Sequence, residues 1–281
     1  MTAQPDNVLP FEADKPTVSK ILVTPEMAQR WLDRNTRNRR VRPTTVKKYA
    51  RDMAAGRWHL TGEGIKFAPD GSLLDGQQRL MAIVQSGATV LLDVHRGIDP
   101  DAQRYMDTGR ARTASDALTM KGERHTATLA AASRLALGFA ADLPDPGKYD
   151  ATHGEVEALI EQHPELRQAA EVACSLARRT DVPPAVVAYS YWRMSQVAGA
   201  QAAADFWVAA ADKVGLSAGD PVIALTNRFA EARRGRERLT KQAMLSLIFR
   251  AWNARRAHKS LRILRVNSSS GGLVPVPELR P

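Results

Sequence analysis

The sequence has a single cysteine and no long apolar run. Cys174, alone among 281 residues, excludes an internal disulfide and a cysteine-rich metal site. No segment approaches the roughly 18 consecutive apolar residues of a membrane helix, and the N-terminal residues lack the basic start and apolar core of a secretory signal. We therefore expect a cytoplasmic protein without a membrane segment.

Two other absences narrow the function classes. The six histidines are scattered without the spacing of metal ligands, so they predict no metal site. The sequence also lacks the G-x-x-x-x-G-K-[ST] loop and the G-x-S-x-G elbow. P-loop NTPases and α/β-hydrolases are therefore disfavoured.

Positive charge, by contrast, is abundant and concentrated in two blocks. The chain carries a net charge of +10. Residues 34–57 contain nine Lys or Arg against one acid, and residues 228–265 contain twelve against two. Basic blocks on a mildly acidic body favour a polyanionic partner, because each neutralised phosphate releases counterions. The alternative is a pair of solvated, charge-rich helix faces.

We predict that both blocks contact the DNA backbone. Trp252, which lies among arginines of the second block, is either a core residue or a platform on which a base stacks. The predicted DNA-binding residues are Lys47, Lys48, Arg51, Arg250, Arg255, Arg256 and Lys259.

Hydrophobic periodicity predicts an α+β fold, with an N-terminal α/β domain followed by an all-α domain. We expect a flexible arm over residues 1–20, the α/β domain over 21–118, the helical domain over 119–266 and a flexible tail over 267–281. After residue 120, apolar residues recur at helical spacing between Pro and Gly breaks, which predicts six or seven helices. The tail is rich in Ser, Gly and Pro.

The α/β domain begins with two helix signals. Thr24 followed by Pro25 is typical of a helix start. Thr44 or Thr45 can cap a second helix, whose opposite faces are apolar and basic.

A hairpin, a helix and a strand follow. The segments IKF and SLL flank the turn signal APDG and predict the hairpin. QQRLMAIVQ predicts a helix that ends at Gly87, and the β-branched segment TVLLDVHRGI predicts a buried strand. The residues expected to face inward from this helix are Leu80, Ile83 and Val84.

The segment DGQQR links the hairpin to this helix. Gly76 permits a tight turn, and the N–H groups at a helix start attract anions. Asp75 can cap the helix or hold a metal, a water or a ribose hydroxyl, while Arg79 can donate to phosphate oxygens. Taken alone, the segment is better explained by an Asp-capped amphipathic helix with an exposed arginine; the surrounding segments favour the phosphate site.

Two further segments could converge on the same polyphosphate. They are NTRNRR, residues 35–40, and DTGRARTAS, residues 107–115, which contributes Arg110 and Arg112. Glu63, Asp75 and Asp107 are the candidate acid/base residues or Mg²⁺ ligands. A surface loop acid is the alternative role for Glu63.

Together these elements resemble the core of the ParB/sulfiredoxin superfamily, in particular the phage and actinobacterial ParB-like proteins. A basic Asn-x-Arg segment, a hairpin and DGQQRLMAIVQSG leading into an apolar strand carry the resemblance, which covers residues 15–115. The motif positions are occupied by Gly76, Gln77, Gln78, Arg79, Ala82 and Gly87.

The resemblance implies a nucleotide site. Superfamily members bind CTP or ATP in this corner, and they include DNA-sliding CTPase clamps, a sulfinic-acid reductase, amino-acid kinases and proteins described as nucleases. The residues implied to contact the triphosphate are Gly76, Gln77, Gln78 and Arg79, with Arg37, Asn38 and Arg39 as the counterpart of the first motif. Partition proteins carry Glu-Arg-Arg in place of Gln-Gln-Arg, and Cys174 lies far from the position of the sulfiredoxin cysteine.

We therefore predict a nucleotide-dependent DNA-binding protein of the ParB-like type, encoded by a phage or mobile element, in which CTP or ATP, with Mg²⁺ as an option, gates DNA binding. One alternative is a ParB-fold enzyme that acts on DNA or nucleotides as a phosphotransferase or nuclease. Another is a DNA-binding regulator without nucleotide turnover. A homodimer is a further option.

Overall fold

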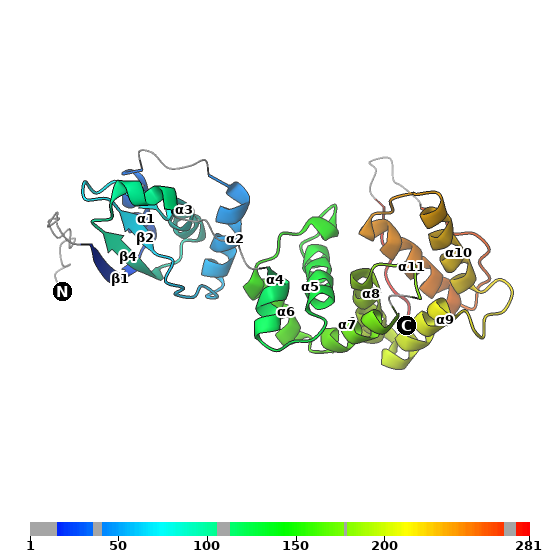
Figure 1. The fold of residues 1–281 in the computed structure, drawn as a ribbon. Coiled ribbons are helices and arrows are strands. Elements are labelled where there is room, and N and C mark those ends of the chain that lie inside the picture. The colour runs from blue at the N-terminus through cyan, green and yellow to red at the C-terminus, as the bar shows by residue number, and fades with distance from the viewer. Residues whose placement is uncertain (1–15, 36–40, 106–112, 177–178, 267–273) are drawn as a thin grey trace. The chain divides into compact units, whose positions relative to one another are not determined.

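A computed structural model describes residues 16–35, 41–105, 113–176, 179–266 and 274–281. The chain divides into two compact units, Met1–Ala111 and Arg112–Pro281 (Figure 1). The predicted α+β composition is confirmed, because a small mixed sheet with helices forms the first unit and helices form the second. No helix in the described ranges combines the length and apolar composition needed to cross a bilayer.

The first unit contains both strands and helices. Its elements are β1 (Thr17–Val23), α1 (Pro25–Leu32), α2 (Pro43–Ala54), β2 (Ile65–Phe67), β3 (Leu73–Asp75), α3 (Gln77–Ser86), β4 (Val90–Arg96) and the 3-10 helix η1 (Pro100–Tyr105). Residues 17–20, expected to belong to a flexible arm, therefore lie in a strand.

Within the described residues of the second unit, every regular element is a helix. Its elements are α4 (Ala114–Met120), α5 (Thr126–Ala140), the 3-10 helix η2 (Pro146–Lys148), α6 (His153–Gln162), α7 (Glu165–Leu176), α8 (Pro184–Ala198), α9 (Ala200–Asp212), α10 (Pro221–Arg234) and α11 (Lys241–Arg256). Seven of these α-helices follow residue 120, as expected. The domain boundary predicted after residue 118 falls inside α4, which belongs to this unit.

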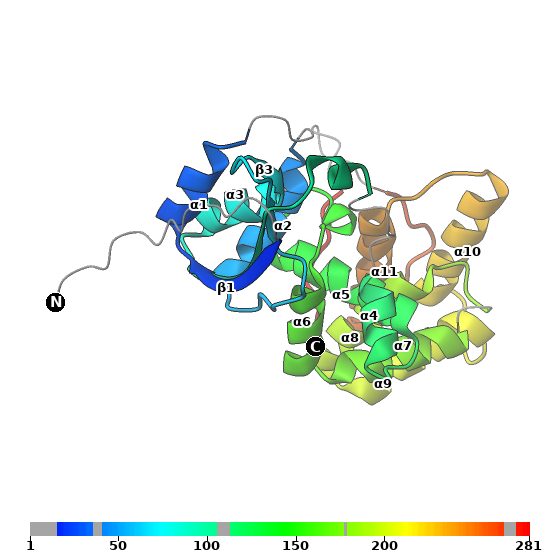
Figure 2. The ribbon, with the colours of Figure 1, turned by 60° about the vertical axis from the view of Figure 1, so that its left-hand side comes forward.

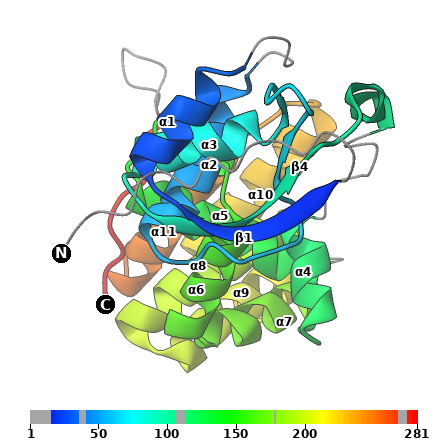
Figure 3. The ribbon, with the colours of Figure 1, turned by 90° about the vertical axis from the view of Figure 1, so that its left-hand side faces the viewer.

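The sheet has the strand order β1-β4-β2-β3. β4 pairs antiparallel with β1 and parallel with β2, and the predicted hairpin joins β2 to β3. α1, α2 and α3 lie together on one face of the sheet (Figure 2 and Figure 3). The core between these layers contains Val23, Val46, Ile65, Leu80, Ile83, Leu92 and Val94, all of which are buried.

Because helices cover one face of the sheet, β4 is only half-buried. Leu91 is 41% exposed, and its cross-strand partner Leu22 is 62% exposed. The predicted buried strand is therefore buried on one face only. The predicted inward orientation was wrong for Val84 on α3, which is 37% exposed, whereas Leu80 and Ile83 face the core as predicted.

Local sequence signals place most helix ends. Thr24 caps α1 and accepts a hydrogen bond from the N–H of Met27. Gly87 ends α3 in the left-handed conformation. The predicted Thr44 or Thr45 cap of α2 is wrong, because Pro43 occupies the first helical position and the helix starts earlier.

Within the second unit, α8 is the central helix and packs against α5, α7, α9 and α11 (Figure 1). It is buried almost all round over residues 185–192. Small residues on its neighbours, among them the fully buried Ala132, Ala169 and Ala173, allow the helix backbones to approach closely.

Residues 274–281 lie against α11 and are not a free tail. The Nδ2 of Asn253 donates to the carbonyl of Glu278 at 2.7 Å, and its Oδ1 accepts from the N–H of Arg280 at 2.8 Å. Ser246 donates to the carbonyl of Pro275 at 2.7 Å. The flexible tail predicted from composition is therefore held, over these residues, by side chains of α11.

Candidate functional site

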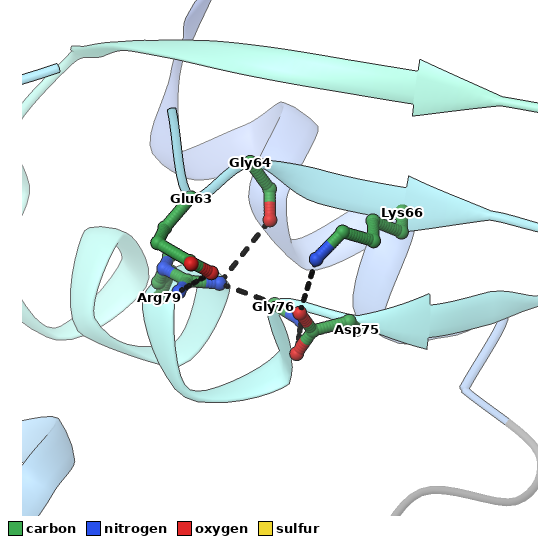
Figure 4. A network of polar contacts seen from close by, with 6 residues as sticks. All are labelled: Glu63, Gly64, Lys66, Asp75, Gly76 and Arg79. Carbon is green, nitrogen blue, oxygen red and sulfur yellow. Dashed lines mark hydrogen bonds and ion pairs between the residues drawn. The ribbon is translucent and has the colours of Figure 1, made fainter. Parts of the chain in front are cut away.

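The candidate site is the corner between β3 and α3 (Figure 4). The loop before β2, with Glu63 and Gly64, and β2 itself also contribute to it. Gly76 stands at the N-cap position of α3 with φ +99°, a conformation that glycine adopts far more readily than other residues. A Cβ at this position would lie 2.5 Å from Cδ1 of Ile65. The corner thus needs glycine both for its backbone conformation and for its close approach to β2.

Arg79, on the first turn of α3, ties the helix to the loop before β2. Its Nη1 donates to the carbonyl of Gly64 at 3.1 Å, and its Nη2 donates to Glu63 Oε2 at 3.3 Å. The Arg79 side chain is 13% exposed, whereas that of Glu63 is 58% exposed. The Nη1 side of the guanidinium is therefore fixed by a main-chain carbonyl. Its Nη2 side is paired with a carboxylate that faces solvent.

Asp75 joins the two strands of the hairpin and the start of the helix. Its Oδ2 lies 3.0 Å from Lys66 Nζ and 3.8 Å from Arg79 Nη1, and its Oδ1 accepts from the N–H of Gly76 at 2.7 Å. Lys66 and Asp75 are cross-strand partners, so the hairpin register itself brings them together. Asp75 thus lies between two cations and a main-chain donor.

These contacts set the ionisation of Asp75. Burial alone would raise the pKa of its carboxyl. The hydrogen bond from Lys66, the charges of Arg79 and Lys66 and the N–H of Gly76 outweigh burial, so the pKa is lowered. Asp75 is therefore a stably ionised carboxylate at neutral pH. As the structure stands, it is better placed to orient cations than to act as a proton donor.

Gln77 and Gln78 begin α3, as predicted, and the side-chain oxygen of Gln78 is buried without a hydrogen-bond partner among the described residues. An unpartnered buried acceptor is uncommon in folded proteins. It marks the helix start as a place where a ligand or water can supply a donor.

The sequence prediction missed two residues of this corner, Lys66 and Gly64. The signal for Lys66 was present, since opposite charges at paired hairpin positions predict an ion pair. Gly64 approaches β4 closely, and a Cβ there would lie 2.2 Å from the carbonyl oxygen of Asp93. That contact depends on sheet pairing and is not visible in the local sequence.

Several predicted site residues lie outside the described residues. They are Arg37, Asn38, Arg39, Asp107, Arg110 and Arg112. The structure therefore brings Glu63, Asp75 and Arg79 together, and the expected convergence of three basic segments stays a prediction. No group of three or more His, Cys, Asp or Glu side chains suited to a metal occurs within the described part of the chain.

The predicted DNA-binding residues of the first unit lie on α2. Lys47 is exposed, whereas Lys48 and Arg51 are partly buried. They share the helix with the buried residues Val46 and Met53, which hold its other face against the core.

The predicted DNA-binding residues of the second unit lie on or just after α11. Three of them form hydrogen bonds or an ion pair with other residues of the protein. Arg250 donates to the carbonyl of Arg265 at 2.6 Å, and Arg256 donates to the main-chain oxygen of Pro281 at 3.0 Å. Arg255 lies 3.7 Å from Asp220, and Lys259 is exposed.

Trp252 is a core residue and not a stacking platform. It is 2% exposed, packs edge-on against Phe206, and its Nε1 donates to the carbonyl of Arg280 at 2.8 Å. The alternative of base stacking is therefore excluded for the arrangement that the structure shows.

Comparisons with known proteins add no assignment. No family model matches the chain, and no curated protein or solved structure matches it either. The resemblance to the ParB/sulfiredoxin superfamily thus rests on the sequence motif alone.

Proposed function

We propose that this chain binds a nucleoside triphosphate, CTP or ATP, at the start of α3 and that the bound nucleotide controls its contact with DNA. The observation that carries the proposal is the position of Arg79. Its guanidinium is oriented by Gly64 and Asp75 at a helix start whose N–H groups have no partners within the helix. The motif resemblance to ParB-like proteins supports the same ligand.

Glu63 competes with phosphate in this arrangement. It occupies the outer edge of the Arg79 guanidinium, and the corner as a whole balances two cations against two carboxylates. A triphosphate must therefore displace Glu63, which is feasible because its side chain is largely in solvent and an exposed ion pair contributes little stability. Arg79 then gives its outer Nη2 to a phosphate oxygen in place of the carboxylate.

The DNA part of the proposal rests on charge. Lys47 and Lys259 are exposed, and Arg250 of α11 keeps its full positive charge because it bonds to a neutral main-chain carbonyl. DNA binding through such residues weakens steeply as the salt concentration rises. Binding releases counterions from the DNA phosphates, and a high salt concentration makes that release less favourable. We propose contacts with the DNA backbone and no particular sequence preference.

The test is calorimetric titration with CTP, ATP, GTP and UTP, with and without Mg²⁺ and duplex DNA. The Glu63→Gln variant removes the competing charge, and we expect it to bind triphosphate about fivefold more tightly than the unaltered protein. Asp70→Asn is the matched control, since it removes an exposed carboxylate from the turn of the same hairpin. If both variants gain equally, or if no nucleotide binds, the site is not at this corner.

The same samples separate the enzyme alternatives. DNA-stimulated release of phosphate indicates a nucleotide switch, and transfer of phosphate to a hydroxyl indicates a phosphotransferase. Nicking of DNA in the presence of Mg²⁺ indicates a nuclease. Binding of DNA without any nucleotide effect, measured by gel shift over a salt series, indicates a regulator without nucleotide turnover.

A further inference from the structure

Residues 274–281 are held on α11 as a separate peptide would be held. Ser246 donates to the carbonyl of Pro275, and Asn253 bonds to the main chain farther along the segment. Among the described residues, no hydrogen bond between two main-chain groups outside helices and strands involves this segment. Its polar contacts therefore join side chains of the helix to its main chain, and they do not require that helix and segment belong to one chain.

The side chains that bond to the segment form one contact surface on α11. Its members are Ser246, Trp252, Asn253 and Arg256. Ser246 and Asn253 are separated by about two helical turns, so they lie on the same face of the helix. Contacts that come later along α11 also come later along the segment, so the segment runs parallel to the helix. The α11 contact surface thus follows the main chain of the segment and selects an extended conformation.

Two apolar side chains anchor the segment. Val276 and Leu279 are partly buried against the helical core, whereas Glu278 and Arg280 are exposed. The prolines of the sequence VPVPELRP fix φ, and each favours an extended conformation of the residue before it. Much of the segment is therefore extended before it binds, so binding costs less conformational entropy.

We propose that the α11 contact surface also binds residues 274–281 of a second copy of this chain. A second copy carries the identical segment, so every contact described above can form between two chains. The two arrangements differ only in the link through residues 267–273, whose composition is mainly Ser and Gly. The proposal concerns the helical unit and does not depend on the nucleotide site.

The chain's own segment is the competitor. A short link gives a tethered segment an effective concentration on the order of millimolar. The unaltered chain therefore stays closed on itself at micromolar concentration, and exchange between copies increases with concentration. A pair of variants removes this competition when each lacks one half of the contact.

The experiment mixes two full-length variants. The acceptor copy carries Val276→Asp and Leu279→Asp, which remove both apolar anchors and leave the α11 contact surface intact. The donor copy carries Ser246→Ala and Asn253→Ala, which remove three hydrogen bonds to the segment and leave the segment itself intact. Only the acceptor contains ¹⁵N-labelled tryptophan, so its indole N–H resonances alone are recorded.

The indole N–H of Trp252 gives the readout, because it donates to the main chain of the docked segment. As the donor copy is added, we expect this resonance, assigned with the Trp252→Phe variant, to return saturably to its position in the unaltered protein. The indole of Trp192, which donates to Glu165, should not move. Sedimentation should show a complex of one donor and one acceptor.

Glu278→Gln in the donor is the matched control, since this exposed residue contributes its carbonyl to the contact. It should leave the affinity unchanged, whereas Leu279→Asp in the donor should weaken docking about tenfold. A synthetic peptide of residues 274–281 repeats the titration with a ligand that does not have to fold. Docking of the peptide without docking of the donor copy would overturn the second copy as occupant. Absence of a saturable shift with either would overturn the α11 contact surface as a docking site.

Discussion

The two units use their positive side chains in different ways. In the corner of the first unit, Lys66 and Arg79 meet the carboxylates of Asp75 and Glu63, so the charges cancel. On α11 of the second unit, Arg250 donates instead to the main-chain carbonyl of Arg265, although Arg255 on the same helix pairs with Asp220. A guanidinium bonded to a carbonyl keeps its charge, because its partner is neutral.

This difference has a consequence for anion binding. Under the proposed function, the α11 surface attracts polyanions at a distance, although many of its donors are already occupied. The corner has little net charge and attracts anions weakly, yet it fixes one guanidinium in a defined orientation. Charge counted along the sequence does not point to the corner, because its four charged residues lie outside both basic blocks.

The largest effect is expected from breaking the corner. Gly76→Ala should lower the free energy of unfolding of the first unit by about 2–4 kcal/mol, through left-handed strain and overlap with Ile65. Gly87→Ala, at the other end of α3, is the control, because its φ is +69° and a Cβ there meets nothing within 4 Å. It should cost only about 1 kcal/mol. Urea unfolding monitored by hydrogen exchange measures the free energy of unfolding of both variants. Equal losses of stability in the two variants would mean that the overlap with Ile65 is unimportant.

A smaller effect is expected from breaking the contact between α11 and residues 274–281. Asn253→Ala removes two hydrogen bonds and should cost about 1–2 kcal/mol, mainly as faster hydrogen exchange in that segment. Gln242→Ala, at the start of the same helix, should leave the exchange unchanged. Protection of the segment that survives Asn253→Ala would show that apolar packing alone holds it.

The smallest effect, and the one that sharpens the comparison, is a difference in acid sensitivity. The folded pKa of Asp75 is lowered, so its contribution to stability is present above the unfolded pKa and is lost as pH falls through the folded value. Carbonyl acceptors do not titrate. Acid should therefore weaken the corner but leave the bonds of Trp252 and Asn253 to the main chain of residues 278–280 intact. Hydrogen exchange at neutral and acidic pH checks this. In the Asp75→Asn variant, the exchange rates of α3 should depend less on pH than in the unaltered protein, once the intrinsic pH dependence of exchange is taken into account.

Much of the first unit could be predicted because its signals are local. Thr24 caps a helix, the turn between β2 and β3 makes a hairpin, and Gly87 ends α3; each depends on residues within a few positions. One error was local, because Pro43 places the start of α2 ahead of Thr44. The errors of burial came from outside this range. β4 was expected to be a buried strand, but the number of layers that cover a sheet is decided by distant packing.

The candidate site was predictable only in part, for the same reason. Asp75, Gly76 and Arg79 follow one another along the chain and were found. The acceptor of Arg79 is the carbonyl of Gly64, 15 positions away, and any residue type could supply a carbonyl. The segment that covers α11 is bound in the same manner, through its main chain, so its composition suggested mobility although its backbone is held.

The pairing of β1 with β4 also determines when the first unit can form. Val23 pairs with Val90, and the remaining pairs are still farther apart in the sequence, whereas the hairpin of β2 and β3 is local. During synthesis, β1 therefore leaves the ribosome long before its partner strand exists. Val18 and Leu22, already exposed in the folded unit, are then part of an unpaired apolar strand. Slow translation between residues 24 and 90 would lengthen the time in which nascent chains can associate.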